Sequence, residues 1–200
     1  MPLFVITGGI GAGKSTVLDC WRRLGMRTAE ADQMAHAQYL PGRPAWEAMR
    51  GRWGEGILDT TGTVSRTVVA DIVFRDPAEL AWLNGLLHPL VRDEMLALAS
   101  AAPTPLFCAV PLYYEANWTG LAGKVFVVWC RPEIQRRRLQ ERGWSQAEIA
   151  RRLDSQIGQD EKLERADFAI INDYSSDILM AQCRDLLGRL AGSGLMTPRS

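Results

Sequence analysis

The stretch of sequence that decides the fold lies near the start of the chain and is rich in glycine. It consists of Gly8-Gly9-Ile10-Gly11-Ala12-Gly13-Lys14-Ser15. These residues fit the phosphate-binding pattern G-x-x-x-x-G-K-[ST]. Glycine allows turns that a β-carbon would forbid, so that backbone N–H groups can converge on phosphate oxygens at a helix N-terminus. Lys14 would reach the β- and γ-phosphates, and the Ser15 hydroxyl would ligate Mg²⁺.

The surroundings of this loop favour nucleotide binding over the alternative of a flexible glycine-rich turn. The apolar run Leu3–Ile6 before it has the character of a strand, and Thr16–Trp21 after it continues as a helix. A strand, a loop and a helix in this order are the context that the pattern requires. We therefore expect the nucleotide-binding residues of the loop to be Gly9, Ile10, Gly11, Ala12, Gly13, Lys14, Ser15 and Thr16.

Composition excludes several classes of function. The 200 residues are 47% hydrophobic, which suits one globular domain with a full core, and the formal net charge is zero. A neutral chain offers no general electrostatic case for binding nucleic acid or an acidic membrane surface. The apolar run Val125–Cys130 is too short to span a bilayer. The four cysteines are scattered, and Cys108 and Cys130 lie in apolar runs, so we expect these two to be buried thiols rather than metal ligands. A reducing cytoplasm fits this pattern.

Short apolar runs alternate with longer helical patterns, which predicts an α/β fold with a parallel sheet. The second strand is short and polar, so we place it near the edge of the sheet. Between Ala35 and Ala99 we expect helices and no strand, with Leu80–Leu87 as the clearest helical stretch. A helical insertion of this length is typical of a region that covers a substrate. The five predicted strands are Leu3–Ile6, Arg27–Ala31, Leu106–Val110, Val125–Cys130 and Phe168–Ile171.

One carboxylate is well placed for catalysis. Many P-loop proteins hold Mg²⁺ with an acid at the end of a second core strand, but Leu106–Val110 runs into Pro111 with no acid before Glu115. Asp32 follows the predicted strand Arg27–Ala31, which we expect to lie beside the P-loop strand. It would accept the proton of an attacking hydroxyl and touch the Mg²⁺ shell. An equally weighted alternative makes Asp32 the N-cap of a helix from Gln33 to Tyr39.

Basic residues downstream suggest a second element of a phosphoryl-transfer site. Arg138 and Arg142 are four residues apart, so we expect them to share one helix face. Arginines of a lid stabilise the charge of a transferring phosphoryl group, although a solvated basic face would have the same pattern. His88 precedes Pro89, which predicts an extended conformation at a helix boundary. The residues alone leave open whether His88 contacts an anionic substrate or is structural.

Seven motifs in order give the chain a family resemblance over nearly its whole length. The segments that carry the resemblance are Thr7–Ser15, Glu30–His36, Gly62–Arg66 with Val73-Phe74, Leu87–Val91, Val110–Glu115, Gln135–Arg142 and Ala166–Asn172. With these segments the chain resembles dephospho-coenzyme A kinase, whose D-A-D-x-x-A-R, G-x-[LV]-x-R and V-P-L-L-x-E motifs are similar to three of them.

The resemblance implies a reaction and a fold. ATP would phosphorylate the 3′-hydroxyl of dephospho-coenzyme A to give coenzyme A and ADP, with Mg²⁺ as cofactor. The fold would be a five-stranded parallel sheet of the P-loop kinase type with a helical substrate region and a lid. We expect a single domain over 1–200, with a core over 1–34, 105–134 and 164–191, a substrate region over about 35–100 and a lid over about 135–163. We also expect a cytoplasmic monomer or weak homo-oligomer without nucleic-acid or membrane partners.

The resemblance also implies roles for individual residues. Asp32, Lys14 and Arg138 would be catalytic, and Ser15 and Asp32 would bind the metal. Beyond the loop, Arg142 and Asn172 would bind ATP. The substrate contacts would be Asp32, Arg66, His88 and Glu115.

The chain departs from the family pattern at three positions. Glu30 stands for Asp, Tyr113 stands for Leu, and His36 replaces the usual Arg and so removes a fixed positive charge. A P-loop kinase of another small hydroxyl substrate would share the loop, the base and the lid. A nucleotide-binding regulatory module that no longer transfers phosphate would be expected to lack Lys14, Ser15, Asp32 or the lid arginines, and all of these are present. A dinucleotide-binding oxidoreductase is disfavoured, because lysine stands where G-x-G-x-x-G requires its third glycine.

Overall fold

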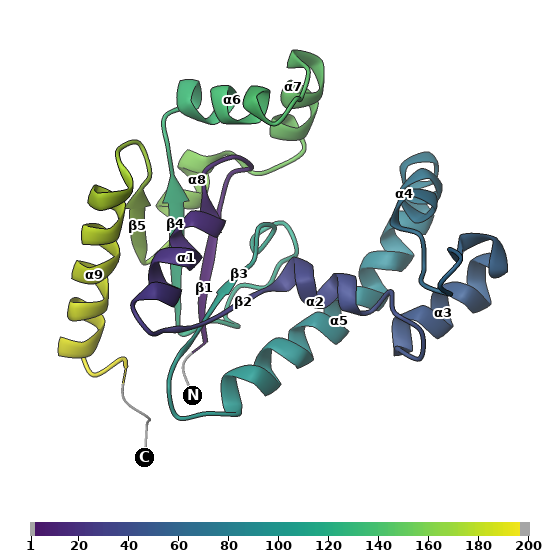
Figure 1. Ribbon diagram of the computed structural model, residues 1–200, viewed down its shortest axis with the longest axis horizontal. Coiled ribbons are helices and arrows are strands. Elements are labelled where there is room, and N and C mark those ends of the chain that lie inside the picture. Colours follow the sequence, from purple (N-terminus) through teal and green to yellow (C-terminus); the bar gives the residue numbers. More distant parts are fainter. Residues whose placement is uncertain (1–2, 197–200) are drawn as a thin grey trace. The chain divides into compact units, whose positions relative to one another are not determined.

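The computed structural model describes residues 3–196 and divides into two compact units. One unit comprises Met1–Glu30 and Leu98–Ser200, and the other comprises Ala31–Ala97. Residues 1–2 and 197–200 of the predicted 1–200 domain lie outside the described residues. Each unit is described by itself below, with the elements labelled as in Figure 1.

The first unit contains a five-stranded sheet in which every neighbouring pair of strands is parallel. This confirms the predicted α/β class and all five predicted strands to within one or two residues at their ends. The strand order is β2-β3-β1-β4-β5 (Figure 1). The strands are β1 (Leu3–Gly8), β2 (Arg27–Glu30), β3 (Leu106–Ala109), β4 (Lys124–Trp129) and β5 (Phe168–Ile171).

The place of β2 confirms one expectation and corrects another. It lies at the edge of the sheet, as its short and polar sequence predicts, but it is not beside β1 because β3 lies between them. All four residues of β3 are buried, whereas all four residues of β2 are only partly buried. The apolar strand therefore takes the interior position, where both of its faces are covered, and the polar strand takes the edge.

A dense aromatic core lies between the sheet and two helices, α1 (Lys14–Arg23) and α9 (Ser176–Gly192). The Trp21 ring of α1 is fully buried, 4.4 Å from the ring of Phe107 and 5.2 Å from the ring of Phe126. Its indole N–H donates to the Cys183 carbonyl of α9 at 3.4 Å. Burial of rings of this size supplies much of the hydrophobic free energy of a small core. The core thereby fixes α1, whose first residues carry the predicted phosphate site.

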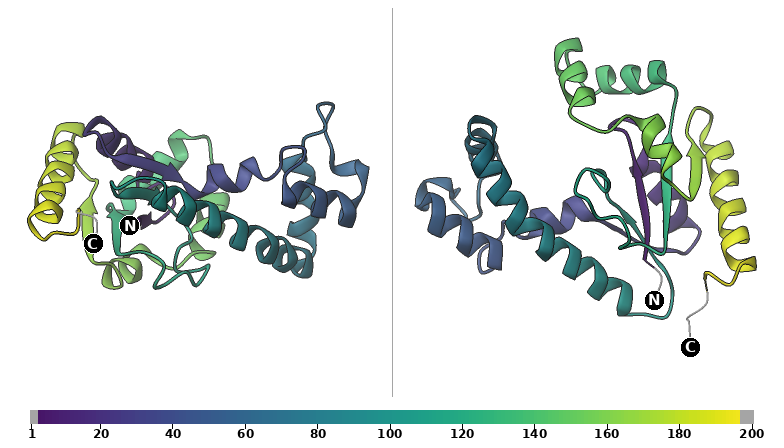
Figure 2. Two further views of the ribbon diagram at one scale, coloured as in Figure 1. Left: turned by 90° about the horizontal axis from the view of Figure 1, so that it is seen from below. Right: turned by 180° about the vertical axis from the view of Figure 1, so that it is seen from behind.

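Three further helices of the first unit follow β4. They are α6 (Pro132–Glu141), α7 (Gln146–Asp154) and α8 (Gln159–Glu164). Whereas α1 lies in front of the sheet in Figure 1, α8 lies in front of it in the rear view of Figure 2. The two helices thus cover opposite faces. Over residues 3–196, no helix has the length and apolar character that crossing a membrane demands.

The second unit is helical, as the sequence predicts. Among residues 31–97, all of which the structure describes, the strand-like pairing is limited to an isolated bridge between Leu58 and Val64. A hydrophobic cluster holds the helices together, and the Trp46 indole N–H donates to the Gly62 carbonyl at 2.7 Å. The elements are α2 (Ala31–Ala37), α3 (Pro44–Trp53), the 3₁₀ helix η1 (Glu55–Ile57), α4 (Arg66–Arg75) and most of α5 (Pro77–Ser100).

The prediction of a helix boundary at His88-Pro89 is wrong. Both residues lie inside α5, which continues to Ser100. Leu86 and Leu87 before the proline and Leu90 after it pack against the same hydrophobic cluster. Burial on both sides offsets the hydrogen bond that proline cannot donate and the strain that its ring imposes on the preceding turn.

Candidate active site

The loop between β1 and α1 approaches its neighbours so closely that two of its positions admit only glycine. Gly8 and Gly13 have positive φ angles of 145° and 98°. A β-carbon on Gly8 would lie 2.3 Å from the carbonyl oxygen of Val128, and one on Gly13 would lie 2.0 Å from Nδ2 of Asn172. The glycines of the motif therefore serve close packing as well as backbone freedom.

Lys14 ties the start of the loop to its end. Its Nζ donates to the carbonyl of Gly8 at 2.9 Å and to the carbonyl of Gly9 at 3.0 Å. Lys14 is also the first residue of α1, and the first turn of this helix contains no acidic residue. Ser15 and Thr16 in the same turn are exposed. An open helix N-terminus beside an ammonium group is an environment that favours an anion.

Side chains from α6 and from the end of β5 hold the middle of the loop. Nε2 of Gln135 donates to the Ile10 carbonyl at 2.7 Å. The Ala12 carbonyl accepts from Nδ2 of Asn172 at 2.8 Å and from the Arg138 guanidinium at 3.3 Å. The carbonyls of the loop are thus turned toward the protein. This arrangement orders the loop before any ligand binds.

The charge at the loop is positive. Arg138 is partly buried, and its guanidinium also donates to the carbonyl of Asn172 at 2.9 Å. The neighbouring Cys130 does not offset this charge, because burial raises the pKa of its thiol and keeps it neutral. Lys14 and Arg138 therefore bring two cations to the loop, which is the arrangement that a polyphosphate needs.

The two predicted lid arginines lie at the end of α6. Arg138 is in the last turn of the helix and partly buried, whereas Arg142 is its C-cap residue and is exposed. Gly143, with its positive φ of 84°, follows immediately, and a shared helix face for the two arginines stays a prediction. Asn172 follows β5 and contacts the P-loop directly through its side chain.

Asp32, Arg66 and His88 belong to the second unit. The N-cap alternative for Asp32 is wrong, because α2 begins at Ala31 and Asp32 lies inside its first turn. Asp32 and Arg66 are both exposed and both influence His36, whose pKa is lowered by burial and by Arg66 and raised in part by Asp32. These three side chains therefore form one electrostatic group. Partial burial lowers the pKa of His88, so that its imidazole is neutral at pH 7.

Glu115 takes part in a network that the sequence did not reveal. Its Oε1 lies 2.7 Å from Nζ of Lys162 and accepts from the Ile157 N–H at 3.0 Å. The sequence around Lys162 resembles an exposed polar helix, yet this lysine is fully buried. No local pattern indicates this burial, because Glu115, the partner of Lys162, is distant in the sequence.

Comparison with known proteins gives this geometry a context. A model of the dephospho-CoA kinase family matches residues 3–177. The chain belongs to the dephospho-CoA kinase family. A dephospho-CoA kinase of Synechococcus sp. (strain JA-3-3Ab) is 37% identical and is covered over 99% of its length by 100% of this chain. One from Geobacillus kaustophilus is 39% identical, with 84% of this chain and 85% of the relative covered. The family predicted from the motifs is confirmed.

Solved structures agree with this dephospho-CoA kinase assignment. TT1252 from Thermus thermophilus superposes with a TM-score of 0.81 at 30% identity, covering 94% of this chain and 97% of its own. The dephospho-CoA kinase of Campylobacter jejuni superposes with a TM-score of 0.71 at 27% identity, covering 96% and 98%. A shikimate kinase of Acinetobacter baumannii, at 15% identity and a TM-score of 0.56, shares the P-loop kinase fold. Membership of a kinase family with this fold implies ATP as the phosphoryl donor.

The side chains available to a metal ion suit Mg²⁺ bound through phosphates. Residues 3–196 contain no cluster of three or more His, Cys, Asp or Glu side chains that could enclose a metal. Mg²⁺ in kinases keeps several waters and binds through substrate phosphates and one or two protein oxygens. The exposed hydroxyl of Ser15, in the first turn of α1, is a donor of this type. The donor set therefore fits Mg²⁺ that arrives with the nucleotide.

Proposed function

We propose that this protein transfers the γ-phosphoryl group of ATP to the 3′-hydroxyl of the ribose of dephospho-coenzyme A, giving coenzyme A and ADP. This is the last step of coenzyme A biosynthesis. The observation that carries the proposal is the P-loop of a chain in this family, already held by Lys14, Gln135, Arg138 and Asn172. In the reaction the acceptor oxygen bonds to the γ-phosphorus, the bond from that phosphorus to the β,γ-bridging oxygen breaks, and the hydroxyl proton leaves.

The donor side is built from the P-loop, Gly9 to Thr16. Phosphate oxygens would accept from N–H groups at the start of α1, where the helix has no acceptors of its own. When ATP binds, Lys14 would give up its hydrogen bonds to the carbonyls of Gly8 and Gly9 and contact the β- and γ-phosphates instead. Arg138 would stabilise the charge that spreads over the transferring group. Asn172 and Arg142 complete the proposed contacts with ATP.

Asp32 would accept the proton of the attacking hydroxyl. Its carboxylate is exposed in the first turn of α2. A carboxylate in this role also orients the hydroxyl for attack, which contributes as much through geometry as through basicity. Bound Mg²⁺ would neutralise charge on the phosphates, and Ser15 and Asp32 are the residues that we propose for its protein contacts.

The acceptor would bind to the helical region over about 35–100, with Arg66 and His88 as contacts. Arg66 at the start of α4 provides a guanidinium suited to a phosphate of the substrate. The neutral imidazole of His88 would accept or donate one hydrogen bond. Glu115 stays a predicted substrate contact.

The segment over about 135–163 would act as the lid. We place the protein in the cytoplasm as a monomer or weak homo-oligomer.

A coupled ADP-release assay tests the proposal. ATP is held constant while dephospho-coenzyme A is compared with nucleosides, nucleotides and shikimate, each corrected for ADP released without an acceptor. We expect dephospho-coenzyme A to give the highest kcat/KM by at least about a hundredfold, because a site whose polar groups pair with the bound substrate rejects analogues that leave those groups unpaired. A higher kcat/KM for any other acceptor would contradict the proposed substrate.

A further inference from the structure

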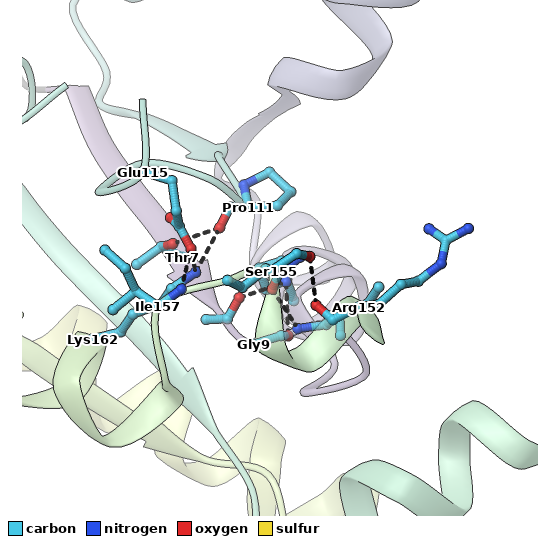
Figure 3. Close-up of polar contacts among 12 residues, drawn as sticks. Thr7, Gly9, Pro111, Glu115, Arg152, Ser155, Ile157 and Lys162 are labelled. Carbon is cyan, nitrogen blue, oxygen red and sulfur yellow. Dashed lines mark hydrogen bonds and ion pairs between the residues drawn. The ribbon is translucent and has the colours of Figure 1, made fainter. Parts of the chain in front are cut away.

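A buried lysine links three segments of the first unit that meet beside the P-loop. Lys162 of α8 is fully buried. Its Nζ forms an ion pair with Oε1 of Glu115 at 2.7 Å and donates to the Pro111 carbonyl at 3.1 Å. Figure 3 shows Lys162, Glu115, Pro111 and Ile157 converging on one another. Pro111 and Glu115 both belong to the loop that follows β3.

The same carbonyl connects Lys162 to the strand that enters the P-loop. The Thr7 hydroxyl donates to the Pro111 carbonyl at 3.2 Å, and Thr7 is a fully buried residue of β1 immediately before Gly8. A single oxygen thus accepts from β1 and from α8. Lys162 thereby joins the carboxyl ends of β1 and β3, which are neighbouring strands in the sheet.

The segment between α7 and α8 is attached at two consecutive residues. The Ile157 N–H donates to Oε1 of Glu115 at 3.0 Å, the same oxygen that pairs with Lys162. Oε1 of Gln156 accepts from the Ile10 N–H of the P-loop at 3.3 Å. The segment 155–158 therefore connects the Glu115–Lys162 pair to the backbone of the phosphate-binding loop.

Stability alone does not account for an ammonium group in this position. Removing two charges from water costs about as much as their attraction returns, so apolar residues of similar volume stabilise a protein equally well or better. The Oε2 atom of Glu115 is also buried and has no hydrogen-bond partner among the described residues. The best-attested use of a buried ion pair is to specify one geometry.

We propose that Lys162 is a positioning residue for phosphoryl transfer. With Glu115 it fixes the segment 155–158, and through Gln156 it fixes the Ile10 peptide, so that the P-loop and the lid are aligned when ATP reacts. The inference rests on the proposed function for its kinetic consequence. Displacement of a reacting group by about 1 Å, even from a distant substitution, can lower a rate by about a hundredfold.

The main variant is Lys162→Met, which keeps the volume of the side chain and removes its charge. We expect kcat to fall by about tenfold to a hundredfold, while KM for ATP changes by less than about threefold, since Lys14 and the N–H groups at the start of α1 remain in place. The matched control is Lys124→Met. It removes the Lys124–Asp167 ion pair, 2.6 Å long, at the amino end of β4 and away from the P-loop. Its kcat should equal that of the wild type.

Two further variants separate positioning from folding. Lys162→Met combined with Glu115→Gln removes both charges, so we expect its thermal midpoint to recover while its kcat stays low. Gln156→Ala leaves the ion pair intact and cuts only the link to Ile10, and it should lower kcat by about tenfold. Recovery of kcat to within threefold of the wild type in the double variant would overturn the inference. If both Lys162 variants fail to fold, an unchanged kcat in Gln156→Ala would overturn it.

Amide hydrogen exchange provides a readout that does not depend on turnover. In folded Lys162→Met, or in Gln156→Ala where the lysine variants do not fold, the Ile10 amide should exchange at least about tenfold faster, because a released N–H opens more often. Unchanged exchange at Ile10 would refute the positioning role by itself. Wild-type protein that releases no ADP with dephospho-coenzyme A would instead refute the proposed function, and the exchange result would still decide the inference.

Discussion

The two units present their candidate site residues in opposite ways. In the first unit, the carbonyls of Gly8, Gly9, Ile10 and Ala12 accept hydrogen bonds from Lys14, Gln135, Arg138 and Asn172, so the candidate phosphate site is held by the protein itself. In the second unit, Asp32 and Arg66 are exposed residues in the first turns of α2 and α4. The difference suggests that phosphate recognition is preorganised, whereas the acceptor side is completed by its ligand.

The largest effect is expected from Lys14→Ala, which changes the P-loop of the first unit. The variant loses the cation that offsets the charge of the transferring phosphates, so turnover should fall by at least about a thousandfold. It also loses two hydrogen bonds to loop carbonyls, which costs about 1–3 kcal/mol of stability and leaves a folded protein. ADP release and thermal unfolding are the measurements. Turnover near that of the wild type would remove the P-loop from the mechanism.

Arg138→Ala tests whether the guanidinium beside the P-loop stabilises the transition state. We expect kcat to fall by about a hundredfold to a thousandfold, and the Kd for ATP to rise much less, because the guanidinium meets the charge that develops during transfer. Steady-state turnover is compared with equilibrium binding of ATP. Lys124→Met, which removes an ion pair at the far end of β4, is the control for a general loss of stability. A large rise in Kd with unchanged kcat would make Arg138 an anchor for ATP only.

Asp32→Asn tests the exposed candidate residues of the second unit. Asparagine keeps the shape of the side chain but cannot take a proton, so turnover should fall by at least about a hundredfold while ATP still binds. The assay is repeated over a series of Mg²⁺ concentrations. Rescue at high Mg²⁺ would assign Asp32 to the metal, and the absence of rescue would assign it to proton transfer. Wild-type turnover at ordinary Mg²⁺ would exclude both roles and direct attention to Glu30.

The smallest effect concerns the histidines of the second unit. Burial is the main cause that holds the pKa values of His36 and His88 below 6.5. The unfolded chain therefore takes up protons near pH 6.5 that the folded chain takes up only at lower pH. This contribution to stability is complete above pH 6.5 and is lost as the pH falls toward the folded values.

His88→Gln should consequently lose less stability than the wild type on acidification. Solvent screens a half-buried group, so we expect the difference between the two proteins to be less than about 1 kcal/mol. Urea unfolding at about pH 7.5 and pH 5.5 provides the comparison, with His36→Gln as the matched variant. Equal losses of stability in the wild type and in His88→Gln would show that His88 has the same pKa in the folded and the unfolded chain.

Local patterns in the sequence predicted the parts of the fold that depend on neighbouring residues. The P-loop, all five strands and the helical character of the second unit follow from apolar runs, glycine spacing and periodicity. The motifs also identified the family. The motifs predict a catalytic role for Arg138 and an ATP contact for Asn172. Both side chains donate to the Ala12 carbonyl of the P-loop, and their roles stay predictions.

The remaining features depend on contacts between residues that are distant in sequence. The position of β3 between β1 and β2 depends on which strand is better covered, and no local pattern states this. His88 lies inside a helix because packing on both sides of Pro89 outweighs the local preference. Lys162 is buried because Glu115, its partner 47 positions earlier, is brought to it by the fold. A charged residue is expected on the surface until such a partner is known.

The central claim is that the protein phosphorylates one hydroxyl of one acceptor, and the structure of the product tests this most directly. ATP and dephospho-coenzyme A are incubated with the protein, and the product is located by phosphorus NMR and tandem mass spectrometry. The account predicts coenzyme A with the new phosphate on the 3′-oxygen of the ribose, formed in equal amount to ADP. ADP without a phosphorylated acceptor, or a phosphate on any other oxygen, would contradict it.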